Sequence, residues 1–183
     1  MPRVGVLLSG RGSNMQALVE QAAGYEVVLV ASDRPEAGGL ASAREAGLAT
    51  FALSPKGIGK AAFEAALDDA LREADVAVIA LAGYMRLLSP AFVARWVGRI
   101  LNIHPSLLPA YQGLDTHARA LAAREREAGC SVHLVTDELD AGEVLGQTRV
   151  PIEPGDTAET LAARVLVAEH QLYPRVLKDF VHR

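Results

Sequence analysis

The chain has 183 residues, of which 50% are hydrophobic and 22% are charged, a balance that suits a globular protein and excludes a disordered or fibrous one. Its formal net charge of -4 provides no basic field for nucleic acid or for an anionic membrane surface. The single cysteine, Cys130, excludes an internal disulfide and a thiolate metal site.

The apolar run near the N-terminus, Val4–Leu8, is too short for the core of a signal peptide or for a membrane span. A reducing compartment also fits the lone cysteine. We therefore expect a cytoplasmic protein with no membrane or nucleic-acid partner. The oligomeric state stays open, and a homodimer is one candidate.

Short β-branched segments alternate with alanine- and glutamate-rich helical segments, as in βαβ units around a parallel sheet. The expected strands are Val4–Leu8, Tyr25–Ala31, Thr50–Leu53, Val76–Ala82, Ile100–His104, Ser131–Thr136 and Val144–Val150. The expected helices are Asn14–Ala23, Gly39–Ala46, Lys60–Ala74, Thr116–Glu127 and Thr157–His182. We predict a Rossmann-like α/β fold, in which a twisted, mostly parallel sheet of about seven strands carries helices on both faces and residues 1–183 form one domain.

The last expected helix keeps apolar residues at helical spacing along most of its length. Asp156 and Glu159 precede this apolar face in the arrangement of a capping box,. Pro174 lies inside the same segment, and we expect it to kink or break the helix,.

A glycine loop, Ser9–Asn14 with the sequence SGRGSN, follows the first expected strand and precedes a helix. Gly10 and Gly12 allow close backbone approach to a ligand, and the first amides of the helix point at whatever lies there. The spacing matches neither a dinucleotide fingerprint nor a P-loop, so the phosphate of a smaller molecule fits better. The alternative is a plain connector, in which Ser13 or Asn14 only caps the helix.

The segment Ile100–Gly113, ILNIHPSLLPAYQG, carries Asn102 and His104 at the end of a strand. Residues two apart in a strand share a face, so a hydrogen-bond donor and a titratable imidazole should lie together there. Farther along the chain, Asp140 lies in the acidic turn TDELDAG, and Gly142 leaves room for close backbone approach,. Asp140 is the expected partner of His104, although an ordinary strand end and a solvated turn are the alternatives.

Four motifs occur in order along the chain: SGRGSN, LAGYMRLLSP at Leu81–Pro90, LNIHPSLLP at Leu101–Pro109 and TDELDAG at Thr136–Gly142. Together they resemble the glycinamide ribonucleotide formyltransferases, which are folate-dependent enzymes of purine biosynthesis. The similarity runs from the first strand to about Pro174. It implies transfer of a formyl group from 10-formyltetrahydrofolate to the amine of glycinamide ribonucleotide, without a metal.

The resemblance also implies roles for particular residues. The catalytic residues would be Asn102, His104 and Asp140. The substrate would be held by Gly12, Ser13 and Asn14 at its phosphate and by Glu169 at its glycinamide part. The residues placed around the folate are Lys60, Met85, Arg86, Leu87, Leu88, Asn102, Thr136, Asp137, Glu138, Leu139 and Asp140.

The implied chemistry agrees with these residue types. Attack of the amine on the formyl carbon places negative charge on oxygen, which Asn102 and a protonated His104 can stabilise. His104 can then supply a proton to the departing folate nitrogen, while Asp140 orients its ring. Lys60 replaces an arginine of a relative and lacks its fork geometry, and Arg86 could serve only as an ion-pair partner.

Three alternatives share part of this pattern. A formyl-methionyl-tRNA-forming enzyme would need a further nucleic-acid-binding region, and a formyltetrahydrofolate hydrolase would usually carry an N-terminal regulatory segment. A non-enzymatic folate- or nucleotide-binding module would need the glycine loop alone. The other singled-out residues fit ordinary structural roles, with His117 at a helix start or on the surface, and His133 packed on a strand. His170 and His182 fit a helix surface, and Cys130 fits a buried apolar site.

Overall fold

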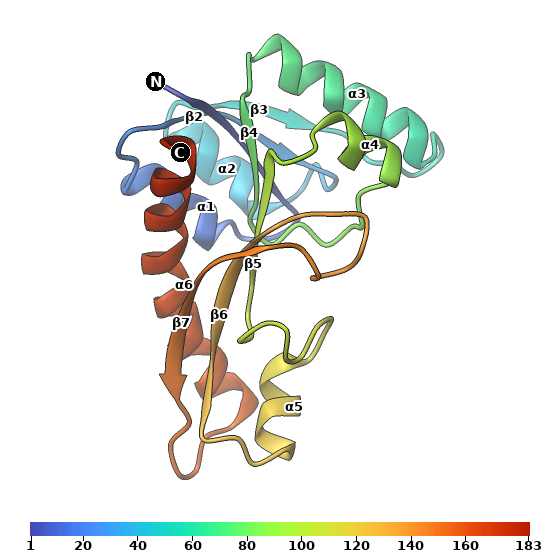
Figure 1. The fold of residues 1–183 in the computed structure, drawn as a ribbon. Coiled ribbons are helices and arrows are strands. Elements are labelled where there is room, and N and C mark those ends of the chain that lie inside the picture. The colour runs from blue at the N-terminus through green and yellow to red at the C-terminus, as the bar shows by residue number, and fades with distance from the viewer.

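The computed structural model describes residues 1–183. Its strands and helices alternate along the chain, except that β7 follows β6 directly (Figure 1). The strands are β1 (Arg3–Leu8), β2 (Glu26–Ser32), β3 (Ala49–Ala52), β4 (Val78–Leu81), β5 (Ile100–His104), β6 (Glu127–Leu134) and β7 (Val144–Pro151). The helices are α1 (Ser13–Glu20), α2 (Gly38–Glu45), α3 (Lys60–Glu73), α4 (Pro90–Arg95), α5 (Thr116–Ala122) and α6 (Ala158–Val181).

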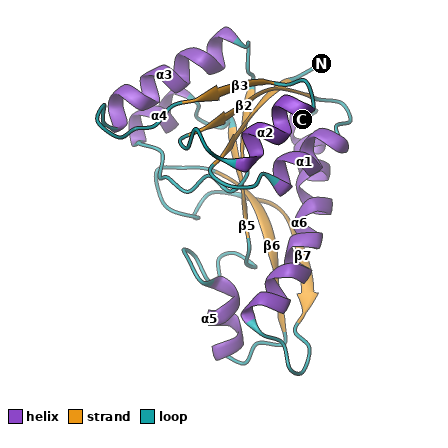
Figure 2. Cartoon of the chain, turned by 180° about the vertical axis from the view of Figure 1, so that it is seen from behind, coloured by secondary structure: helices purple, strands orange, loops and turns teal.

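All seven strands form one sheet in the order β3-β2-β1-β4-β5-β6-β7. The first five strands of this order pair in parallel, whereas β6 pairs antiparallel with both β5 and β7. The predicted α/β fold with a mostly parallel sheet of seven strands is therefore confirmed. In Figure 2, β6, β7 and α5 extend away from the part that contains β2, β3 and α3.

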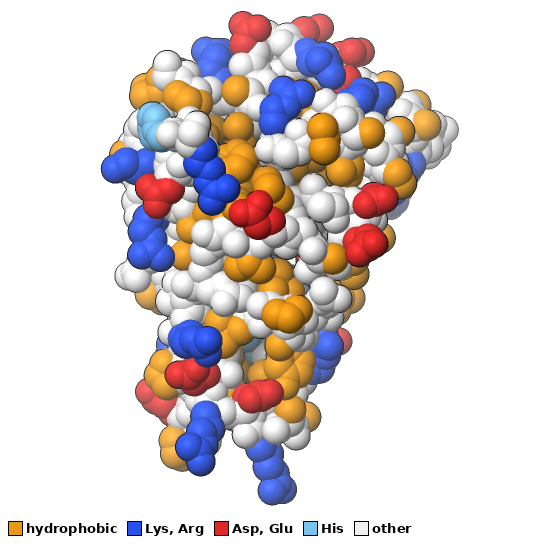
Figure 3. Space-filling view, in the orientation of Figure 1, with side chains coloured by type: hydrophobic (Ala, Val, Ile, Leu, Met, Phe, Trp, Pro, Cys, Tyr) orange, Lys and Arg blue, Asp and Glu red, His pale blue; other side chains and the backbone are white.

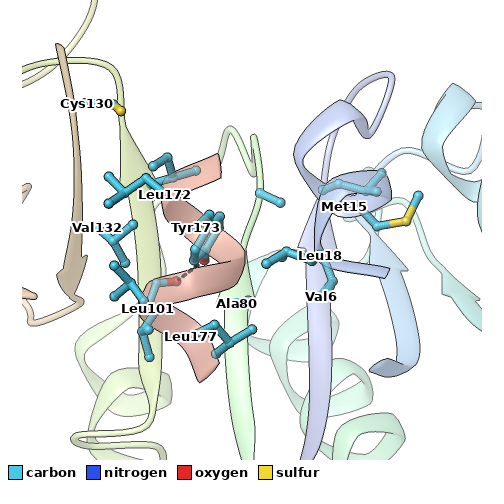
Figure 4. Close-up of a cluster of buried hydrophobic side chains, with 14 of the residues drawn as sticks. Val6, Met15, Leu18, Ala80, Leu101, Cys130, Val132, Leu172, Tyr173 and Leu177 are labelled. Carbon is cyan, nitrogen blue, oxygen red and sulfur yellow. Dashed lines mark hydrogen bonds between the residues drawn. The ribbon is translucent and has the colours of Figure 1, made fainter. Parts of the chain in front are cut away.

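Helices cover both faces of the sheet because the strand residues alternate between two buried clusters. Val4, Val6 and Leu8 of β1 pack with residues of α1, α2 and α6 in one cluster. Leu7 of the same strand packs with residues of α3 and α4 in the other. Figure 4 shows the first cluster, where the hydroxyl of Tyr173 on α6 donates to the carbonyls of Leu81 and Leu101 at 2.9 and 3.2 Å.

Two predicted boundaries are wrong in the region after β5. The helix expected over Thr116–Glu127 ends at Ala122, and β6 begins at Glu127 rather than Ser131. Arg124 adopts a left-handed backbone with φ of 55°, which a continuing helix does not allow. The short helix α4, which precedes β5, was not predicted. Its sequence carries the usual start signal, since the Ser89 side chain accepts a hydrogen bond from the Phe92 amide and Pro90 occupies the first turn,.

The predicted capping pair at the start of α6 is wrong, and so is a break of the helix at Pro174. The capping box forms between Thr157 and Thr160 and does not use the predicted pair Asp156 and Glu159. Pro174 does not break the helix, which continues to Val181. Proline lacks the N–H that would bond the carbonyl four residues earlier, and the His170 carbonyl instead accepts from Gln21 Nε2 at 3.0 Å.

The carboxyl ends of β1, β4 and β5 meet at one edge of the sheet because these strands are parallel neighbours. The chain leaves β1 toward β2 on one side, while β4 lies on its other side. In open α/β sheets, ligands bind in the crevice at such a change of direction. This edge therefore brings the loops after β1, β4 and β5 together.

On the face seen in Figure 3, acidic and basic side chains are interspersed and apolar atoms reach the surface between them. No helix combines the length and the hydropathy needed to cross a membrane.

Candidate functional site

Asn102 and His104 lie at the C-terminal end of strand β5, where the sheet passes from parallel to antiparallel pairing. Asn102 pairs with Leu81 of β4 on one side and with His133 of β6 on the other. His104 is buried, whereas Asn102 is half-buried. The strand thus presents an amide that solvent can reach beside an imidazole that is largely protected from it.

The two nitrogens of His104 face different partners. Its Nε2 lies 2.9 Å from the carbonyl oxygen of Tyr111, a distance at which this nitrogen must carry the proton and donate. Its Nδ1 lies 3.6 Å from Oδ2 of Asp140. The ring is therefore oriented by a carbonyl on one side and can hold a second proton facing a carboxylate on the other.

Asp140 is fixed by the loop that follows β5. Its Oδ2 accepts from the amide of Gly113 at 2.9 Å, and its carbonyl accepts from Gln112 Nε2 at 3.2 Å. Asp140 and Tyr111 both adopt left-handed backbones, with φ of 50° and 54°. Such conformations are uncommon for residues other than glycine and cluster at functional sites. A side chain at Gly142 would collide with the carbonyl of Leu134, which explains the glycine two residues after Asp140.

His133 belongs to the same cluster, although the sequence predicts only a packed strand residue. Its Nδ1 lies 3.0 Å from the Leu134 carbonyl and its Nε2 lies 3.2 Å from Nδ2 of Asn102. Burial lowers the pKa of His133 more than the Leu134 carbonyl and Asp140, whose Oδ1 lies 3.7 Å from Nε2, raise it, and His104 lowers it further. A neutral ring that donates from Nδ1 accepts at Nε2, so His133 orients the Asn102 amide. The cross-strand pairing that reveals this role is not visible in the sequence.

The glycine loop leads from β1 into α1 through Gly12, which has φ of 80°. A Cβ atom at Gly12 would lie 2.9 Å from Cα of Gly39, so the loop and the start of α2 touch backbone to backbone. Gly12 is itself the N-cap, and no side chain caps α1. Neither Ser13 nor Asn14 therefore acts as a cap, and the first amides of the helix remain free for a ligand.

Asn14 on α1 and Glu169 on α6 are both buried. Burial raises the pKa of Glu169 to about 7, and the neighbouring Asn14 amide limits the rise. The Asn14 Oδ1 atom has no hydrogen-bond partner in the protein. A buried carboxyl group poised near neutrality and an unpaired acceptor are features of a binding site.

The two segments implied around a folate are open to solvent. Met85 and Leu87, after β4, are 63% and 65% exposed, and Leu139, in the turn between β6 and β7, is 54% exposed. Arg86 forms an ion pair with the buried Asp33, with Nε and Oδ2 3.0 Å apart. Leu88 is half-buried.

The remaining residues that the resemblance implies around a folate include Thr136, whose hydroxyl accepts from the Glu138 amide at 3.2 Å. Asp137 and Glu138 are exposed in that turn, and Lys60 is exposed at the first residue of α3.

The other histidines and the cysteine lie as follows. His117 is half-buried in α5, and burial, followed by the influence of His104, lowers its pKa. Its Nδ1 is buried without a partner. His170 is half-buried and His182 is exposed. Cys130 is fully buried, which raises the pKa of its thiol to about 12 and confirms the prediction of a small apolar residue.

A pocket of about 450 Å³ lies between the loop after β5, helix α5 and the ends of β6 and β7. Its lining includes Tyr111, Glu125 and Arg149, but not Asn102, His104 or Asp140. Several of its charged side chains already have partners, since Tyr111 donates to Glu125 and Arg149 pairs with Glu127. The convergence of polar groups, rather than pocket size, therefore identifies the cluster around His104 as the candidate active site.

Known proteins share both this fold and much of the sequence. Phosphoribosylglycinamide formyltransferase of Escherichia coli (strain K12) is 45% identical over 182 residues, which cover 96% of this chain and 85% of that protein. The crystal structure of phosphoribosylglycinamide formyltransferase from Brucella melitensis superposes with a TM-score of 0.95 at 54% identity, covering 100% of this chain and 96% of the other.

The chain also matches part of longer proteins. The trifunctional purine biosynthetic protein adenosine-3 of Bos taurus is 43% identical over 181 residues, but the chain spans only 18% of that relative's length. The sequence pattern described as formyl transferase matches residues 2–177. The chain therefore belongs to the formyl transferase family.

Proposed function

We propose that the protein transfers the formyl group of 10-formyltetrahydrofolate to the amine of glycinamide ribonucleotide, forming formylglycinamide ribonucleotide and tetrahydrofolate. The observation that carries this proposal is that Asn102, His104 and Asp140 lie together at the carboxyl ends of the parallel strands. The glycine loop follows β1 at the same edge of the sheet. A formyl transfer enzyme needs both an oxyanion and proton site and an anchor for its phosphorylated acceptor. Membership of the formyl transferase family supports a folate-derived formyl donor.

The acceptor substrate would bind through two features of α1 and α6. Its phosphate would accept hydrogen bonds from the free amides of Gly12, Ser13 and Asn14,. Its amine would lie near Glu169, whose pKa is raised by burial to about 7. This pair of contacts would convert a collision between two substrates into an oriented attack.

The reaction would begin when the unprotonated amine attacks the formyl carbon, giving a tetrahedral intermediate with negative charge on oxygen. Asn102 Nδ2 has one hydrogen directed to His133 and a second that is free to donate to that oxygen. Protonated His104 would stabilise the same charge once one of its N–H groups turns from its present acceptor, the Tyr111 carbonyl or Asp140, toward the substrates. It would then give that proton to the folate nitrogen as the bond from carbon to nitrogen breaks, while the attacking nitrogen, positively charged after attack, would release one of its protons to solvent. Asp140 would keep the ring aimed.

The folate would lie between the Met85–Leu88 segment and the Thr136–Asp140 turn. The exposed side chains of Met85, Leu87 and Leu139 would supply apolar contacts, and backbone groups would read the pterin edge. This reaction uses hydrogen bonds and proton transfer and would need no metal. We place the protein in the cytoplasm, acting on small molecules rather than nucleic acid, and a homodimer is compatible with this role.

The direct test is an assay of tetrahydrofolate release by the purified protein, with and without glycinamide ribonucleotide. The proposal expects release only when both substrates are present. Release without the acceptor would instead indicate a formyltetrahydrofolate hydrolase. Folate binding without any release would indicate a binding module.

A further inference from the structure

We propose that Asp33 is a positioning residue that holds the folate-binding Met85–Leu88 segment in place and joins it, through Ser9, to the loop that would bind the substrate phosphate. This inference rests on the proposed function, because it assigns the roles of both segments. Neither Asp33 nor Ser9 touches the reacting groups in the mechanism above. Both residues would act through other parts of the site.

Four hydrogen bonds connect the ends of three strands. The Ser9 hydroxyl donates to Asp33 Oδ1 at 2.6 Å and accepts from the Met85 amide at 2.9 Å. The Ser9 amide donates to the Gly83 carbonyl at 3.1 Å. Arg86 Nε donates to the second oxygen of Asp33 at 3.0 Å. Residues after β1, β2 and β4 are thereby tied together where the chain direction changes.

Because Ser9 and Asp33 are buried, their hydrogen bonds favour one arrangement of the segments that they join. Ser9 and Asp33 are 3% and 4% exposed, so an unpaired polar group there would lose its bonds to water as well. Asp33 Oδ1 and Oδ2 bond different partners, one through the Ser9 hydroxyl and one through the Arg86 guanidinium. The carboxylate therefore fixes Met85 and Arg86 together, although neither side chain of that pair is buried.

The far end of the same segment is held by a second buried carboxylate. The Ser89 amide donates to Glu64 Oε2 at 2.9 Å, and Glu64 is 3% exposed. Between these anchors, Met85 and Leu87 remain exposed. The segment thus has fixed backbone ends and free apolar side chains, which is the arrangement a ligand-reading loop needs.

Ser9 also begins the glycine loop, so one hydroxyl serves two neighbouring binding segments. Gly10 is tied in turn to α2, since its carbonyl accepts from the Gly39 amide at 3.0 Å. Loss of the Ser9 hydroxyl should disturb both segments. Loss of the Asp33 charge alone should disturb mainly the Met85–Leu88 side, because asparagine can still accept from Ser9.

The test compares Asp33→Asn and Ser9→Ala by steady-state kinetics and by calorimetric binding of a non-reactive folate analogue. Asp33→Asn turns an amide donor toward Arg86, and we expect the KM of the folate to rise about tenfold with the KM of glycinamide ribonucleotide changed less than about twofold. Ser9→Ala should raise both KM values. Unchanged folate binding in Asp33→Asn would overturn the inference.

Two further variants separate positioning from general loosening. Asp68 is also a buried carboxylate, which accepts from Trp96 and pairs with Arg72, but it does not touch either binding segment. Asp68→Asn should lower the melting temperature and leave both KM values unchanged. If it raised the folate KM as much as Asp33→Asn does, the effect would be loss of packing and the inference would fail.

Arg86→Met tests whether Asp33 acts through Arg86. The double variant Asp33→Asn, Arg86→Met should bind folate no more weakly than the worse single variant, because both substitutions remove the same ion pair between Asp33 and Arg86. Additive losses would contradict this connection. A wild-type protein that binds the analogue but never releases tetrahydrofolate would refute the proposed function instead, so the two failures are distinguishable.

Discussion

The two ends of the proposed site are built by different means. Around His104, side chains converge from β5, β6 and the following loops, and both His104 ring nitrogens and the Asn102 amide nitrogen face named partners. At the glycine loop, backbone amides face the crevice without a capping side chain. Side chains can move protons, whereas fixed amides can only hold an anion. The cluster around His104 should therefore control the rate, and the loop should control substrate affinity.

The largest effect should come from Asn102. Replacement by alanine removes the proposed oxyanion donor, and kcat should fall by roughly two to three powers of ten with little change in either KM. Asn102→Asp keeps the shape but offers no N–H, so it should be equally impaired. Steady-state kinetics of both variants would sharpen the comparison, and a normal kcat for Asn102→Asp would exclude Asn102 as the donor.

Glu169 should produce the next effect, in the pH dependence of stability. Its pKa rises from 4.5 to about 7 on folding, so between these values the native state binds more protons than the unfolded state. The free energy of unfolding should therefore fall as pH rises through this window, by about 3 kcal/mol.

Glu169→Gln should remove this slope and be the more stable protein at pH 8, with the difference vanishing toward pH 4.5. Urea unfolding at a series of pH values measures it. The exposed Glu143 offers a control, since Glu143→Gln should leave the slope unchanged. A wild-type slope that survives in Glu169→Gln would show that another group is responsible.

Gly12 tests the affinity side of the comparison. Gly12→Val forces a β-branched residue into a left-handed backbone and against Gly39, so the KM of glycinamide ribonucleotide should rise about tenfold and far more than that of the folate. Gly57 also has positive φ, but it faces open space. Gly57→Val is therefore the control for strain alone, and equal kinetic effects in both variants would make the loop a structural turn.

Much of the fold could be predicted because the spacing of apolar residues and the signals that begin and end helices and strands are local in sequence. Apart from α5 and β6, and the missed α4, every predicted element agrees with the structure within three residues at each end. Alternation in β1 and the apolar spacing of α6 depend only on neighbours in sequence. The early end of α5 depends on Arg124 adopting φ of 55°. Arginine has no preference for this left-handed conformation, so the sequence does not predict it.

The same distinction applies to the site. Asn102 and His104 could be paired from the two-residue period of a strand, and Gly12 could be placed from the turn between strand and helix. The role of His133 depends on antiparallel pairing with β5, and that of Asp33 depends on bonds to Ser9 and Arg86. Contacts between residues so far apart in sequence are fixed by topology and cannot be read from either segment alone.

The most direct test of the division between rate and affinity is a single-turnover measurement on His104→Ala with both substrates saturating. Circular dichroism would establish that the variant is folded. The account predicts that formyl transfer slows by roughly two to three powers of ten, while the dissociation constants of glycinamide ribonucleotide and of a folate analogue stay within about twofold of the wild-type values. A near-normal rate of transfer would show that His104 is an ordinary histidine at the end of β5 and would contradict the mechanism.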